Sequence, residues 1–358
     1  MKNPSFIPAL AVSFGCLLCA SVCGIVLSSC RGETEAESAM QTPARYREMV
    51  TIVPAEVEAR VTGSGADGVF VDGRTVSIAA FSIAKYETTW ELWKEVYDWA
   101  AAHGYRIANR GTEGHGANGT GSAANGWTAE QRRRRPVTDI TWRDAVVWCN
   151  AYSELCGRTP VYYTADDGAA GGSGGSDGGA QRVLRTSVNN TPDDPSRTGT
   201  EADLAVQRLE KDGFRLPLET EWELAARGGS PATEGWDFLY AGGGTGGGID
   251  GIAWYEGNAY TPNTADYGIH PAGTKAAGSA GLFDMSGNAA EWVWDWYNEN
   301  GITPQTPPEG DGAGVFAHRV TRGGSWRGSA AECAVSARNY CRPFSSGTYL
   351  GFRVAQSL

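Results

Sequence analysis

The last stretch of the chain, residues 322–354, constrains the fold more than any other segment. It begins with Gly323-Gly324-Ser325-Trp326 and closes with Leu350-Gly351-Phe352-Arg353-Val354, and both ends are typical of strands that pack into a core. The residues between these two anchors are rich in Ser, Gly, Ala, Arg, Tyr and Asn, a composition typical of a surface. We therefore interpret the stretch as a rigid scaffold that presents a contact face.

Composition limits what the whole chain can be. Its 358 residues are 41% hydrophobic and 10% aromatic, which is enough apolar material for the core of one large domain or two ordinary ones. The 49 glycines indicate that loops and turns are extensive. The net charge of -11 argues against a nucleic-acid partner, because such binding needs a basic surface.

The N-terminus has the pattern of a targeting segment. Lys2 is followed by an apolar stretch from Phe6 to Leu27 and then by Ser28-Ser29-Cys30. This pattern resembles a bacterial lipoprotein signal, so we expect cleavage of residues 1–29, lipid on Cys30, and a flexible tether over residues 30–50. An uncleaved membrane anchor is the alternative, and both place the chain in the bacterial cell envelope. The lipoprotein interpretation places the domain on the outer surface.

Hydrophobic periodicity predicts several elements. Apolar spacing predicts helices at Trp90 to Ala102 and Trp142 to Leu155, with Thr89 and Thr141 as their N-caps. We also expect one or two strands within residues 69–82 around a turn at Asp72-Gly73, a short strand over residues 160–164, a short helix ending at Gly228, and an alternating Trp strand reaching Tyr297.

Six blocks of sequence resemble a known family. They are, in order, FSIAKYETT, PVTDITWRDAVVWCNAYSE, FRLPLETEWELAARGG, GLFDMSGNAAEWVWDWY, RVTRGGSW and GFRVA. In type and order they are similar to the formylglycine-generating-enzyme-like family. The resemblance implies an α+β, C-type-lectin-type fold over residues 51–358, built as a single domain with an antiparallel sheet, two main helices and extensive irregular loops.

The resemblance also raises the question of catalysis. Enzymes of the family use two cysteines, five residues apart in the C-terminal block, to hold copper and activate oxygen. Counting from the Gly-Gly-Ser-Trp anchor places the first on Cys333 and the second on Arg338, while Cys341 comes three residues late. On a strand that shift moves the thiol about 10 Å and to the other face. A copper-dependent oxidase acting on sulfatase cysteines is therefore only an alternative.

No other catalytic set is present in the sequence. The four histidines, His103, His115, His270 and His318, lie far apart and lack Ser, Cys or carboxylate neighbours at a catalytic spacing. The H-x-x-x-H-x-E type spacing of the family's iron-dependent branch is missing. We predict that the chain is not an enzyme and uses no catalytic cofactor.

A structural calcium ion is also implied by the resemblance. The family holds calcium in the loop before the Trp strand, and the matching positions are the carboxylates of Asp284 and Glu291 and the carbonyls of Gly287 and Ala289. Oxygen ligands in a tight turn suit this hard cation. The alternative is that Asp284 is a turn residue and Glu291 belongs to a buried hydrogen-bond network without metal.

One subset of the family is similar in the tail itself, namely the variable proteins of diversity-generating retroelements. There, mutagenesis of adenines converts template Asn codons into many residue types between fixed anchors. Twelve positions match this pattern, and none is Lys, Glu, Gln, Met or Trp, which such codons cannot give. These positions, which we call the candidate face, are Arg327, Gly328, Ala337, Asn339, Tyr340, Cys341, Arg342, Phe344, Ser345, Gly347, Thr348 and Tyr349.

The candidate face has the chemistry of a binding surface. Tyr340, Phe344 and Tyr349 supply rigid contact area, and Arg327 and Arg342 supply charge-assisted hydrogen bonds. We therefore predict a lipid-anchored surface protein that binds a protein or glycan ligand through a hypervariable face. The alternatives are ordinary loop residues on a non-catalytic envelope protein, and the oxidase.

Overall fold

The computed structural model describes residues 40–58, 68–70, 75–114, 127–165, 181–188, 200–243, 248–262, 264, 266–298 and 318–358. The expected signal at residues 1–29, Cys30, and the turn at Asp72-Gly73 lie outside the described residues. Within the described ranges, no helix is long and apolar enough to cross a membrane.

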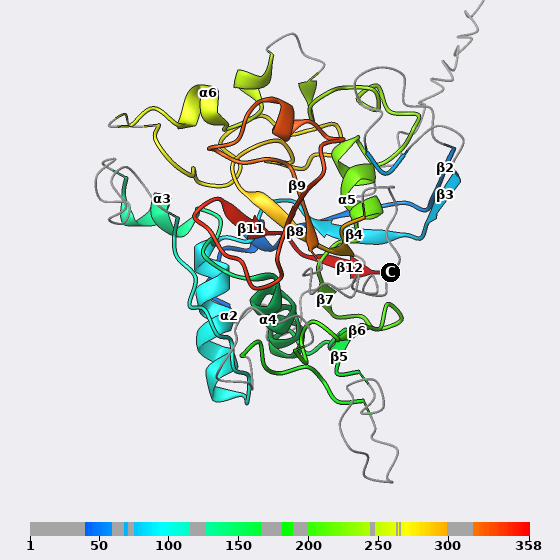
Figure 1. Ribbon diagram of the computed structural model, residues 1–358, viewed down its shortest axis with the longest axis vertical. Coiled ribbons are helices and arrows are strands. Elements are labelled where there is room, and N and C mark those ends of the chain that lie inside the picture. Colours follow the sequence, from blue (N-terminus) through cyan, green and yellow to red (C-terminus); the bar gives the residue numbers. More distant parts are fainter. Residues whose placement is uncertain are drawn as a thin grey trace, which may run out of the picture.

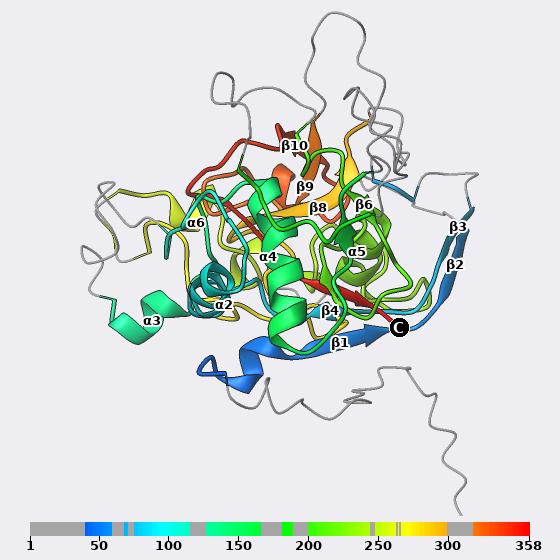
Figure 2. The same cartoon turned by 90° about the horizontal axis from the view of Figure 1, so that it is seen from below.

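Two helices form one side of the molecule, with the bounds that periodicity predicts. They are α2, Trp90–Ala102, and α4, Trp142–Leu155. Thr89 caps α2 by accepting the backbone N–H of Leu92, and Thr141 opens α4 in a capping box with Asp144. The helices lie side by side (Figures 1 and 2), where the Trp148 indole donates to the carbonyl of Trp93 at 3.0 Å. Their apolar stripes supply much of the larger core.

The first four-stranded sheet joins the two ends of the described chain. Its strand order is β1, Met49–Ile52; β4, Phe81–Ala84; β12, Ala355–Ser357; and β7, Phe214–Arg215. All three pairings are antiparallel, as predicted for the fold. Because β12 lies between β4 and β7, the last residues of the chain complete the centre of this sheet.

The second four-stranded sheet carries the C-terminal block. Its order is β10, Asn339–Cys341; β9, Arg319–Arg322; β8, Ala290–Trp296; and β11, Leu350–Phe352. Every residue of β8 is buried, so the alternating Trp strand packs on both faces. The β8–β11 pair is parallel, which the prediction of a wholly antiparallel sheet did not include.

Short elements complete the fold. The sequence did not predict the antiparallel pairing of β2 with β3. The one or two strands expected within residues 69–82 correspond to β3 and β4, which lie in different sheets. The remaining elements are η1, Ala44–Arg47; β2, Ala55–Glu58; β3, Thr75–Ile78; α3, Ala129–Arg133; β5, Tyr162–Tyr163; β6, Val206–Gln207; α5, Glu219–Ala226; η4, Ile249–Gly251; α6, Glu256–Ala259; and η5, Ala331–Cys333.

The predicted tether is shorter than residues 30–50. Thr42 is buried, and its backbone N–H and hydroxyl both donate to the carboxylate of Glu95 on α2, at 2.9 and 2.7 Å. The helix η1 and the strand β1 follow at once. Residues 40–50 therefore belong to the domain, because they make specific contacts with α2 and β4. Their polar composition gave no sign of these contacts in the sequence. Residues 30–39 lie outside the described chain.

A buried ion pair joins the two sheets. Arg353, between β11 and β12, donates to both carboxylate oxygens of Glu291 on β8, at 2.6 to 2.9 Å, and both side chains are fully buried. The same guanidinium donates to the carbonyls of Phe283 and Ala84. The Trp222 indole of α5 donates to Glu291 at 2.7 Å. One carboxylate thus links both sheets and a helix.

We expect Arg353→Met to destabilise the domain strongly. The substitution leaves Glu291 charged and buried without its cation, which costs about 3 to 5 kcal/mol of unfolding free energy. Chemical denaturation followed by tryptophan fluorescence measures the loss. The double variant Glu291→Leu/Arg353→Met is the control, and it should lose less than the single variant because no isolated charge remains. A single variant as stable as the wild type would contradict the proposed link.

Candidate ligand-binding face

The twelve predicted positions of the candidate face share one property, which is that none of them is buried. By contrast, every residue of the two anchors, 323–326 and 350–354, is buried. Tyr340 is 50% exposed, among the most exposed large hydrophobic side chains of the described chain. The buried anchors therefore enclose accessible residues that include the twelve positions together with residues 329–332, Arg338 and Ser346, interrupted by buried residues 333–336 and Pro343.

One part of the face gathers around Tyr349. The guanidinium of Arg327 lies 4.9 Å from its ring centroid. Burial raises the pKa of the Cys341 thiol, and the neighbouring Tyr349 hydroxyl opposes this shift. The Trp326 indole donates to the carbonyl of Thr348 at 3.1 Å, which ties the first anchor to the end of the variable segment. Residues from both ends of the block and from β10 are thereby brought together.

A second part of the face centres on Tyr340 of β10. Its ring lies 4.3 Å from that of Tyr297 and 4.8 Å from that of His318. Burial, and then the charge of Arg342, lower the pKa of His318, so this ring is neutral at physiological pH. Tyr297 and His318 were not among the predicted site residues. Only their positions, just after β8 and just before β9, could have indicated that they flank β10.

The third part of the face is built on Phe344. The guanidinium of Arg143 lies 5.5 Å from its ring centroid and that of Arg342 lies 5.9 Å away. Arg143 projects from α4 and forms a buried ion pair with Asp203 at 2.7 Å. Phe344 therefore rests on a side chain that is fixed from below.

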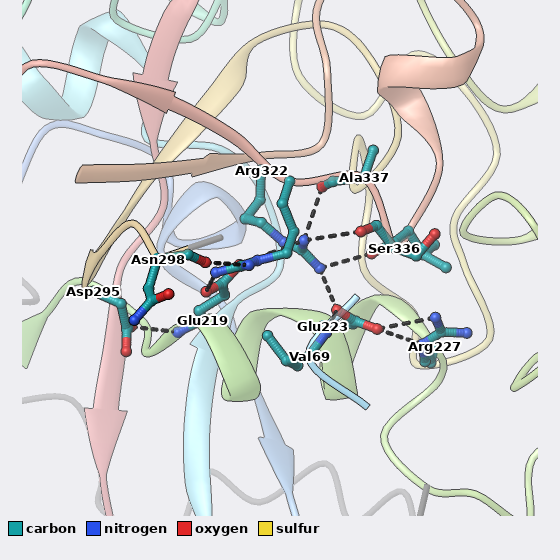
Figure 3. Close-up of polar contacts among 11 residues, drawn as sticks. Val69, Glu219, Glu223, Arg227, Asp295, Asn298, Arg322, Ser336 and Ala337 are labelled. Carbon is teal, nitrogen blue, oxygen red and sulfur yellow. Dashed lines mark hydrogen bonds and ion pairs between the residues drawn. The ribbon is translucent and has the colours of Figure 1, made fainter. Parts of the chain in front are cut away.

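The backbone of the face is held by the buried side chain of Arg322 (Figure 3). It donates to the carbonyl oxygens of Val335 and Ala337, both at 2.8 Å, and to Ser336 at 3.3 Å. Its charge is balanced by Glu223 of α5 at 2.5 Å. The path of the chain into β10 is thus fixed by a residue outside the twelve.

Arg338 is the next residue of the same segment, and its side chain is bound to helix α5. It donates through two nitrogens to both carboxylate oxygens of Glu219, at 2.6 and 2.8 Å, and to the carbonyl of Asn298 at 2.9 Å. Glu219 opens α5, and its own backbone N–H donates to Asp295 at 2.6 Å, as Figure 3 shows. A bidentate pair of this kind sets both position and orientation.

The two glycines of the first anchor permit a close approach to η5. Gly323 and Gly324 have φ of +89° and +69°, a region that side chains disfavour. A Cβ atom on Gly324 would lie 2.7 Å from the carbonyl oxygen of Glu332 and 2.8 Å from the Cys333 sulfur. The Gly-Gly pair is therefore required where the block turns from β9 toward the face.

The geometry of the cysteines does not match a two-thiolate centre. Cys333 is buried, and burial raises the pKa of its thiol to about 12. Arg338 occupies the position predicted for a second thiol and is engaged with Glu219. The four cysteines of the described chain are free thiols, and Cys341 is the one that is partly exposed. A buried, protonated thiol is a poor nucleophile.

One of the four predicted calcium ligands, Glu291, is already engaged by other side chains. Both oxygens of Glu291 are used by Arg353 and Trp222. The backbone N–H groups of Gly287 and Ala289 donate to the Gly323 carbonyl and to Glu87. Among the described residues, no group of three or more His, Cys, Asp or Glu side chains could hold a metal. Calcium binding itself stays an untested prediction.

Asp284, the other carboxylate of the predicted calcium site, is also buried. Burial raises the pKa of its carboxyl to about 6, and one oxygen accepts the backbone N–H of Gly273 at 2.6 Å. Its φ of +56° places it in the left-handed conformation of a turn, which fits both the calcium prediction and the alternative without metal.

Comparison with known proteins identifies the family to which the chain belongs. Residues 34–358 match the Sulfatase-modifying factor enzyme 1-like domain, so the chain belongs to this family, as the six blocks predicted. Solved structures confirm the C-type-lectin-type fold: CarF superposes with a TM-score of 0.61 over 87% of this chain and 98% of its own, at 23% identity.

The individual relatives carry names that imply different functions. Treponema denticola variable protein 1 superposes with a TM-score of 0.59, at 28% identity, over 87% of this chain and 95% of its own. The chaperone protein LppX of Paenibacillus barcinonensis is 28% identical over 295 residues, 79% of this chain and 82% of that protein. The formylglycine-generating enzyme of Streptomyces coelicolor is 37% identical over 153 residues, 40% of this chain and 46% of the enzyme. Membership of the family alone does not decide between catalysis and binding.

We expect the four thiols to differ in reactivity. At about pH 8, iodoacetamide should modify Cys341, which is partly exposed, and leave Cys333 unmodified because its raised pKa keeps the thiol protonated. Peptide mass spectrometry measures the extent at each site. Cys149 and Cys156, both buried, are internal controls, and all four should react in denaturant. Rapid modification of Cys333 in the folded protein would contradict the structural role assigned to it.

Proposed function

We propose that this protein displays a hypervariable ligand-binding face at the surface of a bacterial cell. One observation carries the proposal: all twelve candidate positions are accessible, whereas the anchors on either side are buried. A segment selected for core packing would not divide in this way. The similarity to Treponema denticola variable protein 1 over 87% of the chain supports the same interpretation.

The scaffold explains how the face could change without loss of the fold. The backbone of residues 335–337 is held by Arg322, and residue 338 is itself fixed to α5 through Glu219. Arg322 and Arg338 lie outside the twelve positions. Exchange of the face residues leaves these bonds in place, so each new set of side chains meets a preorganised backbone.

The ligand we propose is a protein or a glycan. The face offers Tyr340, half exposed, together with Phe344 and Tyr349, and each of the latter lies under an arginine guanidinium. Tyrosine and arginine supply large contact area and hydrogen bonds at low entropic cost, which is the composition of binding hot spots.

The position of the face suits display from a lipid anchor. In Figure 2, β1 lies at one side of the molecule and β10 at the opposite side. The described chain begins at Met40, a few residues before β1. We propose that lipid on Cys30 holds the β1 side toward the membrane, so that the face points outward.

We propose that the chain is not an oxidase. The place of the second family cysteine is taken by Arg338, whose guanidinium is committed to Glu219, and burial raises the pKa of the Cys333 thiol to about 12. Conversion of a sulfatase cysteine peptide to formylglycine by the copper-loaded protein would overturn this part of the proposal.

The triple variant Tyr340→Ser/Phe344→Ser/Tyr349→Ser separates folding from binding. It should remain folded, with an unfolding free energy lowered by no more than about 2 kcal/mol, because none of the three is buried. It should lose binding, by at least about tenfold in affinity, to any ligand selected on the wild-type protein from glycan and envelope-protein arrays.

The control for this variant is Val53→Ser/Leu239→Ser, which changes exposed apolar side chains outside the face. It should bind as the wild type does. If the control loses binding while the triple variant keeps it, the ligand binds elsewhere and the face is an ordinary surface.

A further inference from the structure

A second polar site lies away from the candidate face, at the end of α3. Arg135 follows this helix and is fully buried, yet none of its three side-chain nitrogens has a hydrogen-bond partner in the structure. Its guanidinium lies 4.1 Å from the ring centroid of Trp127. An arginine is always charged, and a buried charge normally has a hydrogen-bonded partner.

A buried histidine shares this environment. His270 is only 3% exposed, and the structure gives neither of its ring nitrogens a hydrogen bond. The backbone of Gly268 lies near the ring without making a well-formed hydrogen bond. The ring stacks on Trp254 at 3.5 Å and meets the edge of Trp127 at 5.0 Å. Trp127 thus contacts both His270 and Arg135.

The charged side chains around Arg135 and His270 do not supply the missing hydrogen bonds. Glu113 favours the charge of Arg135, but its carboxylate is paired with Arg132 at 3.3 Å. Asp266 lies 3.9 Å from His270 Nε2, beyond hydrogen-bond reach, and its side chain is 65% exposed. Lys275 stands over Trp254 and adds a further positive charge. The local balance at the guanidinium is therefore positive.

The protonation of His270 fits a role as a neutral donor. Burial, followed by the charges of Arg135 and Lys275, lowers the pKa of the imidazole to about 3. At neutral pH one ring nitrogen therefore carries a hydrogen and can donate it, and the other can accept one. Together with the planar fork of Arg135, this gives donors for one small planar anion.

We propose that Arg135 binds the carboxylate of a small ligand in the site formed with His270, Trp127 and Trp254. The guanidinium would hold both carboxylate oxygens, and the two indoles would flank the ligand. A singly charged planar group suits the site better than sulfate, because burying a second charge costs more than one guanidinium returns. This proposal does not depend on the candidate face or on its ligand.

Access to the site requires movement of Trp127. Its side chain is half-buried and stands over the guanidinium. The Trp254 indole donates a hydrogen bond to Thr274 at 2.9 Å. We therefore expect ligand entry to change the surroundings of Trp127 and to leave most of the other tryptophans unaffected.

Titration of the full-length protein with acetate at constant ionic strength tests the proposal. The indole N–H signals of the thirteen tryptophans, followed by two-dimensional NMR, should show a saturable shift of Trp127, assigned with Trp127→Phe. Acetate should also raise the melting temperature, since it binds only the folded state. Arg135→Gln should weaken the apparent affinity about tenfold or more, because a charge-assisted bidentate contact is lost.

Arg133→Gln is the matched control, because it removes one positive charge from the same run at a half-exposed side chain. It should bind acetate as the wild type does. If Arg135→Gln fails to fold, Arg135→Lys replaces it and should bind more weakly than the wild type, since it keeps the charge but lacks the fork. The absence of a saturable Trp127 shift, an equal response to sulfate, or equal loss in Arg133→Gln would overturn the proposal.

Discussion

The structure of the candidate face depends on one buried guanidinium, that of Arg322. Its charge is balanced by Glu223 of α5, and its two terminal nitrogens also donate to the carbonyls of Val335, Ser336 and Ala337. A buried arginine without these partners would destabilise the fold, so the contacts are mutually required. They fix the backbone where the chain enters β10, and among the face residues above it Cys341 and Tyr349 also pack against the core.

Much of the fold could be predicted because local signals and tertiary packing agree. The helices α2 and α4 have apolar stripes and Thr caps, and the strand β8 has its alternating tryptophans. The parallel β8–β11 pair and the position of β12 could not be predicted, because they depend on where the chain returns after the face. The tether was overestimated because the contact of Thr42 with Glu95 leaves no periodic pattern.

The sequence predicted the accessible positions of the candidate face but not the residues that hold them in place. Accessibility of the twelve positions follows from their place between anchors, which the sequence shows. The partners beneath these positions cannot be predicted in this way, because the bidentate pair of Arg338 with Glu219 joins residues 119 positions apart. That pair also gives the arginine a structural role at the position where the enzymes carry a thiol. Glu291 was assigned to calcium from the resemblance, whereas the structure commits it to Arg353.

The central claim is that the face is exchangeable on a fixed scaffold, and the coding DNA tests it most directly. Sequencing the locus in several isolates should reveal a nearby reverse transcriptase and a second copy of the tail sequence. The two copies should differ only at adenines, with the resulting changes confined to the twelve positions of the candidate face. A locus without such a repeat, or with changes spread equally over the anchors, would contradict the account.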